Sequence, residues 1–143
     1  MTRLVHWERK LADFHKAAFG RPFVWGQTDC CLTASDGVLA ITGIDPGARF
    51  RGAYSDMAGG YRAMKDYAGG GVSETIAALM AENNWPEIPV LMARRGDVGL
   101  VPSGLPGMQA DAAAICLGPH WATRGEGGLV NLPLKQGRRA WRV

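Results

Sequence analysis

The sequence has few of the residues from which metal sites and disulfide frameworks are built. It contains three cysteines and three histidines in 143 residues, and no two cysteines have the Cys-x-x-Cys spacing. Structural zinc sites and disulfide frameworks use paired or regularly spaced cysteines, and an iron–sulfur cluster needs a fourth ligand. We therefore expect no cofactor and no metal, and we expect buried structural thiols of which at most one is reactive.

Long apolar runs are also missing. No stretch approaches the ~20 apolar residues that span a bilayer, and residues 1–20 carry charges throughout, unlike a secretory signal peptide. The sequence therefore predicts no membrane span and a chain that is made and folded in a cytoplasm. Its composition, 47% hydrophobic and 20% charged, is typical of a globular protein. The length fits one domain over residues 1–143.

The excess of positive charge is small, at +3. Nucleic-acid binders usually interleave aromatic residues with a denser field of lysine and arginine. We therefore predict no nucleic-acid partner, and we interpret the basic residues near the C-terminus as a solvated or partner-facing surface. These residues are Arg124, Lys135, Arg138, Arg139 and Arg142.

Apolar residues three and four apart predict helices in the first part of the chain. One helix covers most of the first twenty residues and ends at Gly20, and a second ends at Gly43. A short helix precedes the glycines 69–71, and another helix ends near Trp85. The candidate N-terminal caps are Thr2, Thr28 or Asp29, Ser55 and Ser73.

After these helices the pattern changes to short strands. The segment ARRGDVGLVP predicts a turn at Gly96 and Asp97 that leads into a strand, and DAAAICLGP predicts a buried strand that ends at Gly118. HWATR, GGLVNLP and AWRV have the character of further strands. Helices followed by strands define an α+β fold, with the N-terminal helices packed on an antiparallel meander sheet of about four to five strands.

The stretch WGQTDCCLTASDGV, residues 25–38, contains the candidate nucleophile. The thiolate is the reactive form of cysteine, and the free N–H groups at a helix start stabilise an anion. A helix that begins at Thr28 or Asp29 has Cys30 in its first turn. Cys31 lies about 100° further around the helix, so the two thiols cannot face one cleft equally. The alternative is that both are small buried hydrophobic residues.

This order of parts resembles the NlpC-type peptidases of the papain-like cysteine peptidase superfamily. It resembles more closely a family of small proteins encoded in phage and prophage tail modules, through FVWGQTDCCLTASDGVLAITGID, RGAY, ARRGDVGLV, ICLG and AWRV. The likeness runs from about residue 20 to residue 143. It implies an NlpC-like papain-type fold with Cys30, after Asp29, at the nucleophile position and Cys31 in the core. Gly96 and Asp97 then form a structural turn that fixes the start of a strand.

The resemblance also implies a histidine base at the position of Ala112, and alanine cannot accept a proton. A nucleophilic cysteine needs a base within hydrogen-bond reach. His6 and His15 fall on the first helix, and His120 lies past the far end of the strand, ~26 Å away if the strand is straight. His120 remains the candidate base if the turn folds back. Asp111 points to the opposite strand face and is a weak base for a thiol.

We therefore predict an NlpC-like domain that keeps the scaffold and lacks the catalytic pair. Its expected role is structural, in the tail tip of a phage or phage-like virion, where it packs against hub or distal tail proteins after synthesis in the host bacterial cytoplasm. One alternative is an active peptidase or amidase that cleaves peptidoglycan stem peptides during genome delivery, with Cys30 as nucleophile. Another is a tail-assembly factor that leaves the particle.

The number of tryptophans suggests where such partners bind. Trp is enriched at the centres of interfaces, and the chain has five. Trp85, Trp121 and Trp141 are therefore candidate contact residues, and the alternative is that they fill a small core.

Overall fold

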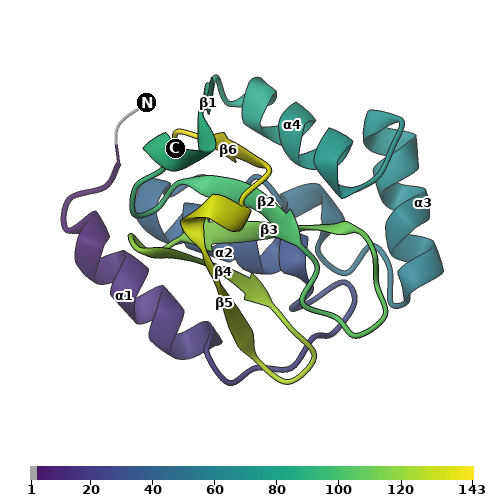
Figure 1. Ribbon diagram of the computed structural model, residues 1–143. Helices are drawn as coiled ribbons and strands as arrows, with labels where there is room; N and C mark the ends of the chain where they lie inside the picture. The colour runs from purple at the N-terminus through teal and green to yellow at the C-terminus, as the bar shows by residue number, and fades with distance from the viewer. Residues whose placement is uncertain (1–2) are drawn as a thin grey trace.

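Four α-helices precede a six-stranded antiparallel sheet in the computed structural model, which describes residues 3–143 (Figure 1). The helices are α1 (Trp7–Ala18), α2 (Cys30–Thr42), α3 (Met57–Ala68) and α4 (Val72–Glu82). The strands are β1 (Glu87–Ile88), β2 (Val98–Pro102), β3 (Asp111–Cys116), β4 (His120–Arg124), β5 (Leu129–Pro133) and β6 (Arg139–Trp141). Short 3-10 turns are η1 (Ala48–Phe50), η2 (Val90–Met92) and η3 (Leu134–Gln136). The predicted α+β class is confirmed.

The strand order β1-β6-β2-β3-β4-β5 is only partly a meander. Strands β2 to β5 follow one another as predicted, but β6 returns to pair with both β2 and β1. The prediction of about four to five strands was therefore too low. The missing strand, β1, has two residues and no apolar alternation that could mark it. Strand β3 ends at Cys116, before the predicted Gly118, where a φ of 107° turns the chain towards β4.

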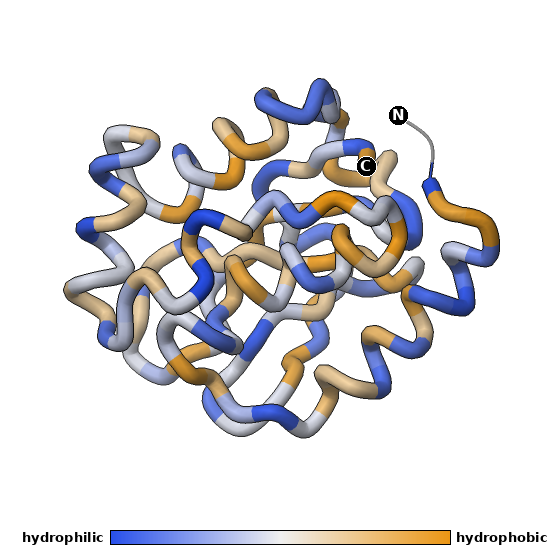
Figure 2. The backbone as a smooth tube through the Cα atoms, turned by 180° about the vertical axis from the view of Figure 1, so that it is seen from behind, coloured by the Kyte–Doolittle hydropathy of each residue, from blue (hydrophilic) through white to orange (hydrophobic). Residues whose placement is uncertain are grey.

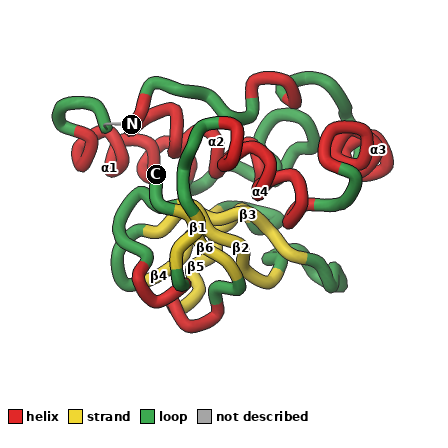
Figure 3. Tube along the Cα trace, turned by 90° about the horizontal axis from the view of Figure 1, so that it is seen from above, coloured by secondary structure: helices red, strands yellow, loops and turns green. Residues whose placement is uncertain are grey.

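The core consists of two apolar clusters, one between the helices and the sheet and one on the outer face of the sheet. The four α-helices lie on one side of the sheet (Figure 3). The larger cluster packs side chains of these helices against one face of the strands, and the backbone at apolar positions is coloured orange in Figure 2. Helix α2 packs closest, because a Cβ on Gly37 would stand 2.9 Å from the Ile115 side chain on β3. On the other face Trp121 covers Gly99, where a Cβ would stand 2.5 Å from the indole ring.

The candidate contact tryptophans belong to the core of this chain. Trp85, Trp121 and Trp141 are only 4%, 0% and 3% exposed, so no other chain is needed to bury them. The indole N–H of Trp121 donates to the Leu134 carbonyl at 3.1 Å. The prediction that these residues are contact residues was wrong, and the alternative that they fill a small core is confirmed, because a small two-faced sheet uses the volume of Trp to fill both faces.

The helix starts differ in part from those expected. Asp29 caps α2 and Gly43 ends it, as predicted, but Asp56 caps α3 in place of Ser55, with a 2.7 Å hydrogen bond from the Gly59 N–H. Helix α4 begins after Gly71, so that the predicted cap Ser73 lies inside its first turn. Helix α1 begins at Trp7, and the candidate cap Thr2 lies outside the described residues.

Candidate functional site

Asp29 fixes the start of α2 and thereby the position of the candidate nucleophile. Its buried carboxylate accepts hydrogen bonds from the N–H groups of Leu32, at 3.0 Å, and Gly26, at 2.9 Å. A third comes from the Tyr54 hydroxyl at 2.5 Å. Burial and this hydrogen bond raise the pKa of Tyr54, so the phenol stays protonated and keeps donating. Cys30 is therefore the first residue of a well-anchored helix.

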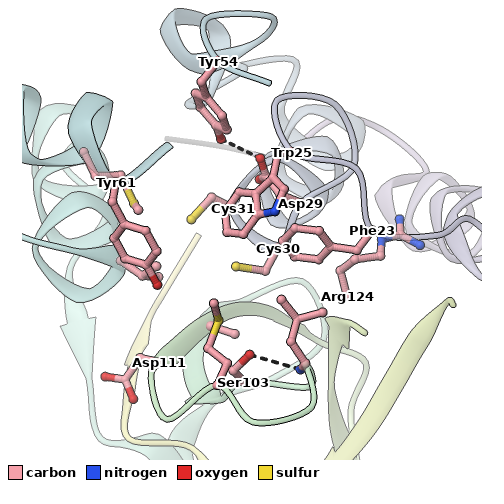
Figure 4. A pocket seen from close by; sticks show the side chains of 15 residues that line it. Phe23, Trp25, Asp29, Cys30, Cys31, Tyr54, Tyr61, Ser103, Asp111 and Arg124 are labelled. Atoms are coloured by element: carbon pink, nitrogen blue, oxygen red, sulfur yellow. Dashed lines mark hydrogen bonds between the residues drawn. The ribbon is translucent and has the colours of Figure 1, made fainter. Parts of the chain in front are cut away.

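A narrow apolar cleft opens beside this helix start (Figure 4). Its volume of about 20 Å³ holds roughly one water molecule. Leu105 and Met108, from the loop between β2 and β3, line it together with residues of the helix start. The full lining is Phe23, Trp25, Asp29, Cys30, Cys31, Tyr54, Tyr61, Met64, Val72, Ser103, Leu105, Met108, Asp111, Ala112 and Arg124.

Both neighbouring thiols line this cleft. Cys30 packs against the apolar cluster that contains Ala112, whereas Cys31 packs against the larger cluster beneath the helices. The two sulfurs point into the same space, as Figure 4 shows, and both residues are partly exposed. Cys31 is therefore not simply a core residue, as its place in the helix had suggested. The first turn of α2 overhangs the cleft, and this lets adjacent side chains both reach it.

The surroundings of the two thiols nevertheless differ. A hydrogen bond with Cys30 and burial raise the pKa of Cys31 well above the usual range. Burial also raises the pKa of Cys116, whose sulfur accepts a hydrogen bond from the Gly118 N–H at 3.4 Å on the far face of the sheet. Cys31 and Cys116 therefore remain uncharged thiols at neutral pH.

We expect iodoacetamide to label the three cysteines in a fixed order. Cys30 should react first, Cys31 at least about tenfold more slowly, and Cys116 only on unfolding, since only the thiolate is a nucleophile. Peptide mass spectrometry after a timed reaction at pH 7.5 measures the order. A Cys30→Ser variant controls for overlap of the two adjacent sites. Equal labelling of Cys30 and Cys31 would contradict the assignment.

Ala112 faces the cleft at the position where the resemblance requires a base. It pairs with Val101 across β2 and β3 and is 2% exposed. Asp111, the neighbouring residue, lies at the mouth of the cleft, where its carboxylate is paired with the guanidinium of Arg138. Alanine has no side-chain atom that can accept a proton, and the Asp111 carboxylate is engaged by Arg138.

The histidines lie elsewhere. His120 begins β4 and lines a separate hollow with His15 of α1, at the end of the sheet away from Cys30. His6 is the residue before α1. No imidazole is among the lining residues of the cleft in the described chain. The structure thus brings Cys30 and Ala112 together and keeps the candidate base His120 apart from both.

The Gly96–Asp97 turn joins the two ends of the chain to β2. Gly96 has a φ of 92°, which glycine adopts without strain. The carboxylate of Asp97, fully buried, accepts from the Arg3 and Arg142 guanidinium groups at 3.1 and 3.0 Å. It also accepts from the N–H groups of Arg94, at 3.0 Å, and Val143, at 3.1 Å. Asp97 is therefore placed as a structural residue, remote from the cleft.

Arg124 is buried, although the sequence analysis placed it on a solvated or partner-facing surface. Its side chain is 2% exposed and reaches under the helices from β4. One N–H donates to the Thr33 hydroxyl at 3.1 Å, and Nη1 donates to the carbonyl of Ala18 at 2.6 Å and to that of Arg21 at 2.5 Å. The guanidinium thus caps the C-terminal end of α1 and ties it to α2 and β4.

Replacing Arg124 by methionine is expected to lower the free energy of unfolding by about 2–3 kcal/mol. The variant keeps the apolar stem but loses charge-assisted hydrogen bonds to three acceptors. Denaturant unfolding followed by circular dichroism measures the loss. Arg9→Met, at an exposed site on the same helix α1, should cost less than about 0.5 kcal/mol. Similar losses in both variants would show that the buried contacts contribute nothing.

Several lining residues could not be assigned to the cleft from the sequence alone. Phe23 and Trp25 stand in the turn before α2, and their rings contact edge to face at 4.7 Å. Tyr61 comes from α3, and burial raises the pKa of its hydroxyl. Leu105 and Met108 belong to a loop rich in glycine and proline, which predicts only a turn. Only the fold brings these residues to the cysteines.

No group of three or more His, Cys, Asp or Glu side chains among residues 3–143 is arranged to hold a metal ion. Within the same range, every helix is too short or too polar to cross a bilayer.

One protein family matches nearly the whole chain. Residues 2–143 match the family described as a domain of unknown function (DUF6950), and the chain belongs to this family. No curated protein matches the chain, and no solved structure does.

Proposed function

We propose that the chain is a structural component of the tail tip of a bacteriophage or phage-like particle, built on an NlpC-like papain-type scaffold that has lost its catalytic base. One observation carries the proposal: the cleft that holds Cys30 in the first turn of α2 presents Ala112, with no imidazole among the lining residues described. The order of helix, Gly-Asp turn and antiparallel strands supports the resemblance to that scaffold.

The shape of the cleft supports a role without turnover. A hydrolase must admit an extended peptide to its nucleophile, and the cavity beside Cys30 holds only about one water molecule. Leu105 and Met108 are among the apolar side chains that line this cavity. Asp29, Cys30 and the helix cap then serve to hold α2 on the sheet. The scaffold is retained for packing, in this proposal, and not for chemistry.

The composition of purified particles tests the structural role. Mass spectrometry of particles from a phage or prophage that encodes this chain should detect it at a fixed ratio to the other tail-tip proteins. Particles lacking the chain should be incomplete at the tail tip in electron micrographs. If cells produce the chain during assembly but the complete particles do not contain it, the chain is a tail-assembly factor and not a structural component.

A further inference from the structure

Two of the most exposed large apolar side chains are neighbours on a short turn at the end of the sheet opposite the cleft. Leu91 and Met92 are 71% and 64% exposed. They belong to η2, between β1 and the Asp97 turn at the start of β2, whereas the cleft lies at the other end of β2, next to Ser103. In Figure 1 this end of the molecule also carries both termini.

The turn that carries this apolar pair is held rigidly. Val90 and Ala93, on either side of the pair, pack into the cluster on the outer sheet face. The Met92 N–H donates to the Pro89 carbonyl at 2.9 Å, and the Met92 carbonyl accepts from the Arg142 guanidinium at 2.6 Å. An exposed apolar pair that is fixed in this way loses little conformational entropy on binding.

Basic residues stand close to the pair in the sequence and on the neighbouring turn. Arg94 and Arg95 are the second and third residues after Met92 and are exposed, with the Arg95 guanidinium 5.9 Å from the centre of the Trp7 ring, and Lys135 is exposed on the neighbouring turn η3. None of the ion pairs formed within residues 3–143 includes Arg94, Arg95 or Lys135. Nearby Asp97 is buried and already shared by two arginines. We call this surface the Leu91 patch; it consists of Leu91, Met92, Arg94, Arg95, Lys135 and Arg142.

We propose that the Leu91 patch is the docking surface for an acidic protein partner, whose apolar hollow receives Leu91 and Met92 while its carboxylates face Arg94, Arg95 and Lys135. Met and Arg are enriched in protein interfaces, and unpaired surface cations select a partner of opposite charge. A membrane is the weaker candidate, because stable binding at a bilayer surface uses a much longer apolar face than one short turn. The identity of the partner as a tail-tip protein rests on the proposed function.

Site-specific photo-crosslinking tests this surface. A photoreactive phenylalanine analogue replaces Leu91 in the full chain, in cells that assemble particles, and irradiation is done both in the cells and on purified particles. The matched control carries the analogue at Met57, an apolar residue 50% exposed at the start of α3. We expect a crosslink from position 91, but not from position 57, to a single protein with an acidic contact surface.

Charge reversal tests the electrostatic part. Arg94→Glu combined with Arg95→Glu should lower the yield of the position-91 crosslink by about tenfold. The double variant should leave the labelling of Cys30 by iodoacetamide unchanged, because the cleft lies at the opposite end of β2. An unchanged yield, or a partner with a basic contact surface, would contradict the proposal.

The outcomes separate this proposal from the proposed function. If particles contain the chain but position 91 crosslinks to no protein, the Leu91 patch is refuted and the structural role stands. A crosslink in cells with no chain in the particles supports the patch and refutes the structural role. Sedimentation with phosphatidylglycerol vesicles tests the membrane alternative. If the chain binds these vesicles, the double variant does not, and position 91 crosslinks to no protein, the Leu91 patch binds lipid and the proposal of an acidic protein partner is refuted.

Discussion

Replacing Asp97 by alanine is expected to lower the free energy of unfolding by about 3 kcal/mol. Breaking a buried ion pair at one partner costs about 3–5 kcal/mol, because the other charge is left without a counter-ion. The lower end of this range applies, because the Arg3 and Arg142 side chains keep 11% and 28% exposure and water solvates them in part. The variant also leaves the N–H groups of Arg94 and Val143 without their acceptor.

The matched control for Asp97 is an exposed ion pair in the same sheet. Glu87 of β1 binds the guanidinium of Arg139 at 2.7 and 2.9 Å, with 47% and 36% of the two side chains exposed. Glu87→Ala should cost less than about 1 kcal/mol. Urea unfolding at pH 7 measures both variants. Equal losses would show that Asp97 does not join the chain ends to β2 in solution.

Placing a histidine at position 112 is expected to raise the rate at which Cys30 is alkylated at pH 6 by about tenfold. An imidazolium beside a thiol stabilises the thiolate, which a free cysteine with a pKa of ~8.5 hardly forms at this pH. A less basic thiolate is also a weaker nucleophile, so the gain in rate is smaller than the gain in thiolate. The rate of Ala112→His should therefore stay high as the pH falls below 7, while that of the unchanged chain declines.

Two controls make this experiment decisive. Ala112→Gln adds similar bulk without an imidazole and should leave the pH dependence unchanged. Both substitutions enlarge a buried side chain, which typically costs about 1–3 kcal/mol, so thermal unfolding must show that each variant is folded. A folded Ala112→His variant with unchanged alkylation would mean that position 112 does not face Cys30.

The parts of the fold that depend on neighbouring residues were predictable. Asp29 before two cysteines and an apolar run predicts a capped helix. The cap forms as predicted, because the Asp29 carboxylate accepts a hydrogen bond from the Leu32 N–H. Gly43, at a φ of 79°, ends that helix as predicted. The Gly96–Asp97 turn and the strands after it could be identified for the same reason, because turn residues and β-rich segments act over a few positions.

The parts that depend on distant contacts were not predictable. The two residues of β1 form a strand only because they pair with β6. Strand β6 is the last strand of the chain and is separated from β1 in sequence by the four other strands. Burial of Arg124 depends on carbonyls at the end of α1, and nothing in the spacing of basic residues distinguishes it from the exposed Lys135. Trp121 needs Gly99 on another strand to create its space.

The candidate site shows the same division. The place of Cys30 at the helix start followed from the order of motifs, and Ala112, the position at which the resemblance implies a base, lines the same cleft. The presence of Cys31 in the same cleft could not be predicted. Neighbouring residues of a helix point about 100° apart, but the sequence does not show how far the cleft extends around the first turn. The part of the lining formed by Leu105 and Met108 comes from a loop whose path the sequence leaves open.

The central claim is that Cys30 occupies a nucleophile position without a working base, and peptidoglycan hydrolysis tests it most directly. Purified peptidoglycan is incubated with the unchanged chain and with its Cys30→Ala and His120→Ala variants, and released stem-peptide fragments are measured by liquid chromatography and mass spectrometry. General-base help is worth roughly 100- to 10,000-fold in rate. We predict no release above the Cys30→Ala background for any of the three. Release by the unchanged chain that both substitutions abolish would contradict the account and identify an active cysteine peptidase with His120 as its base.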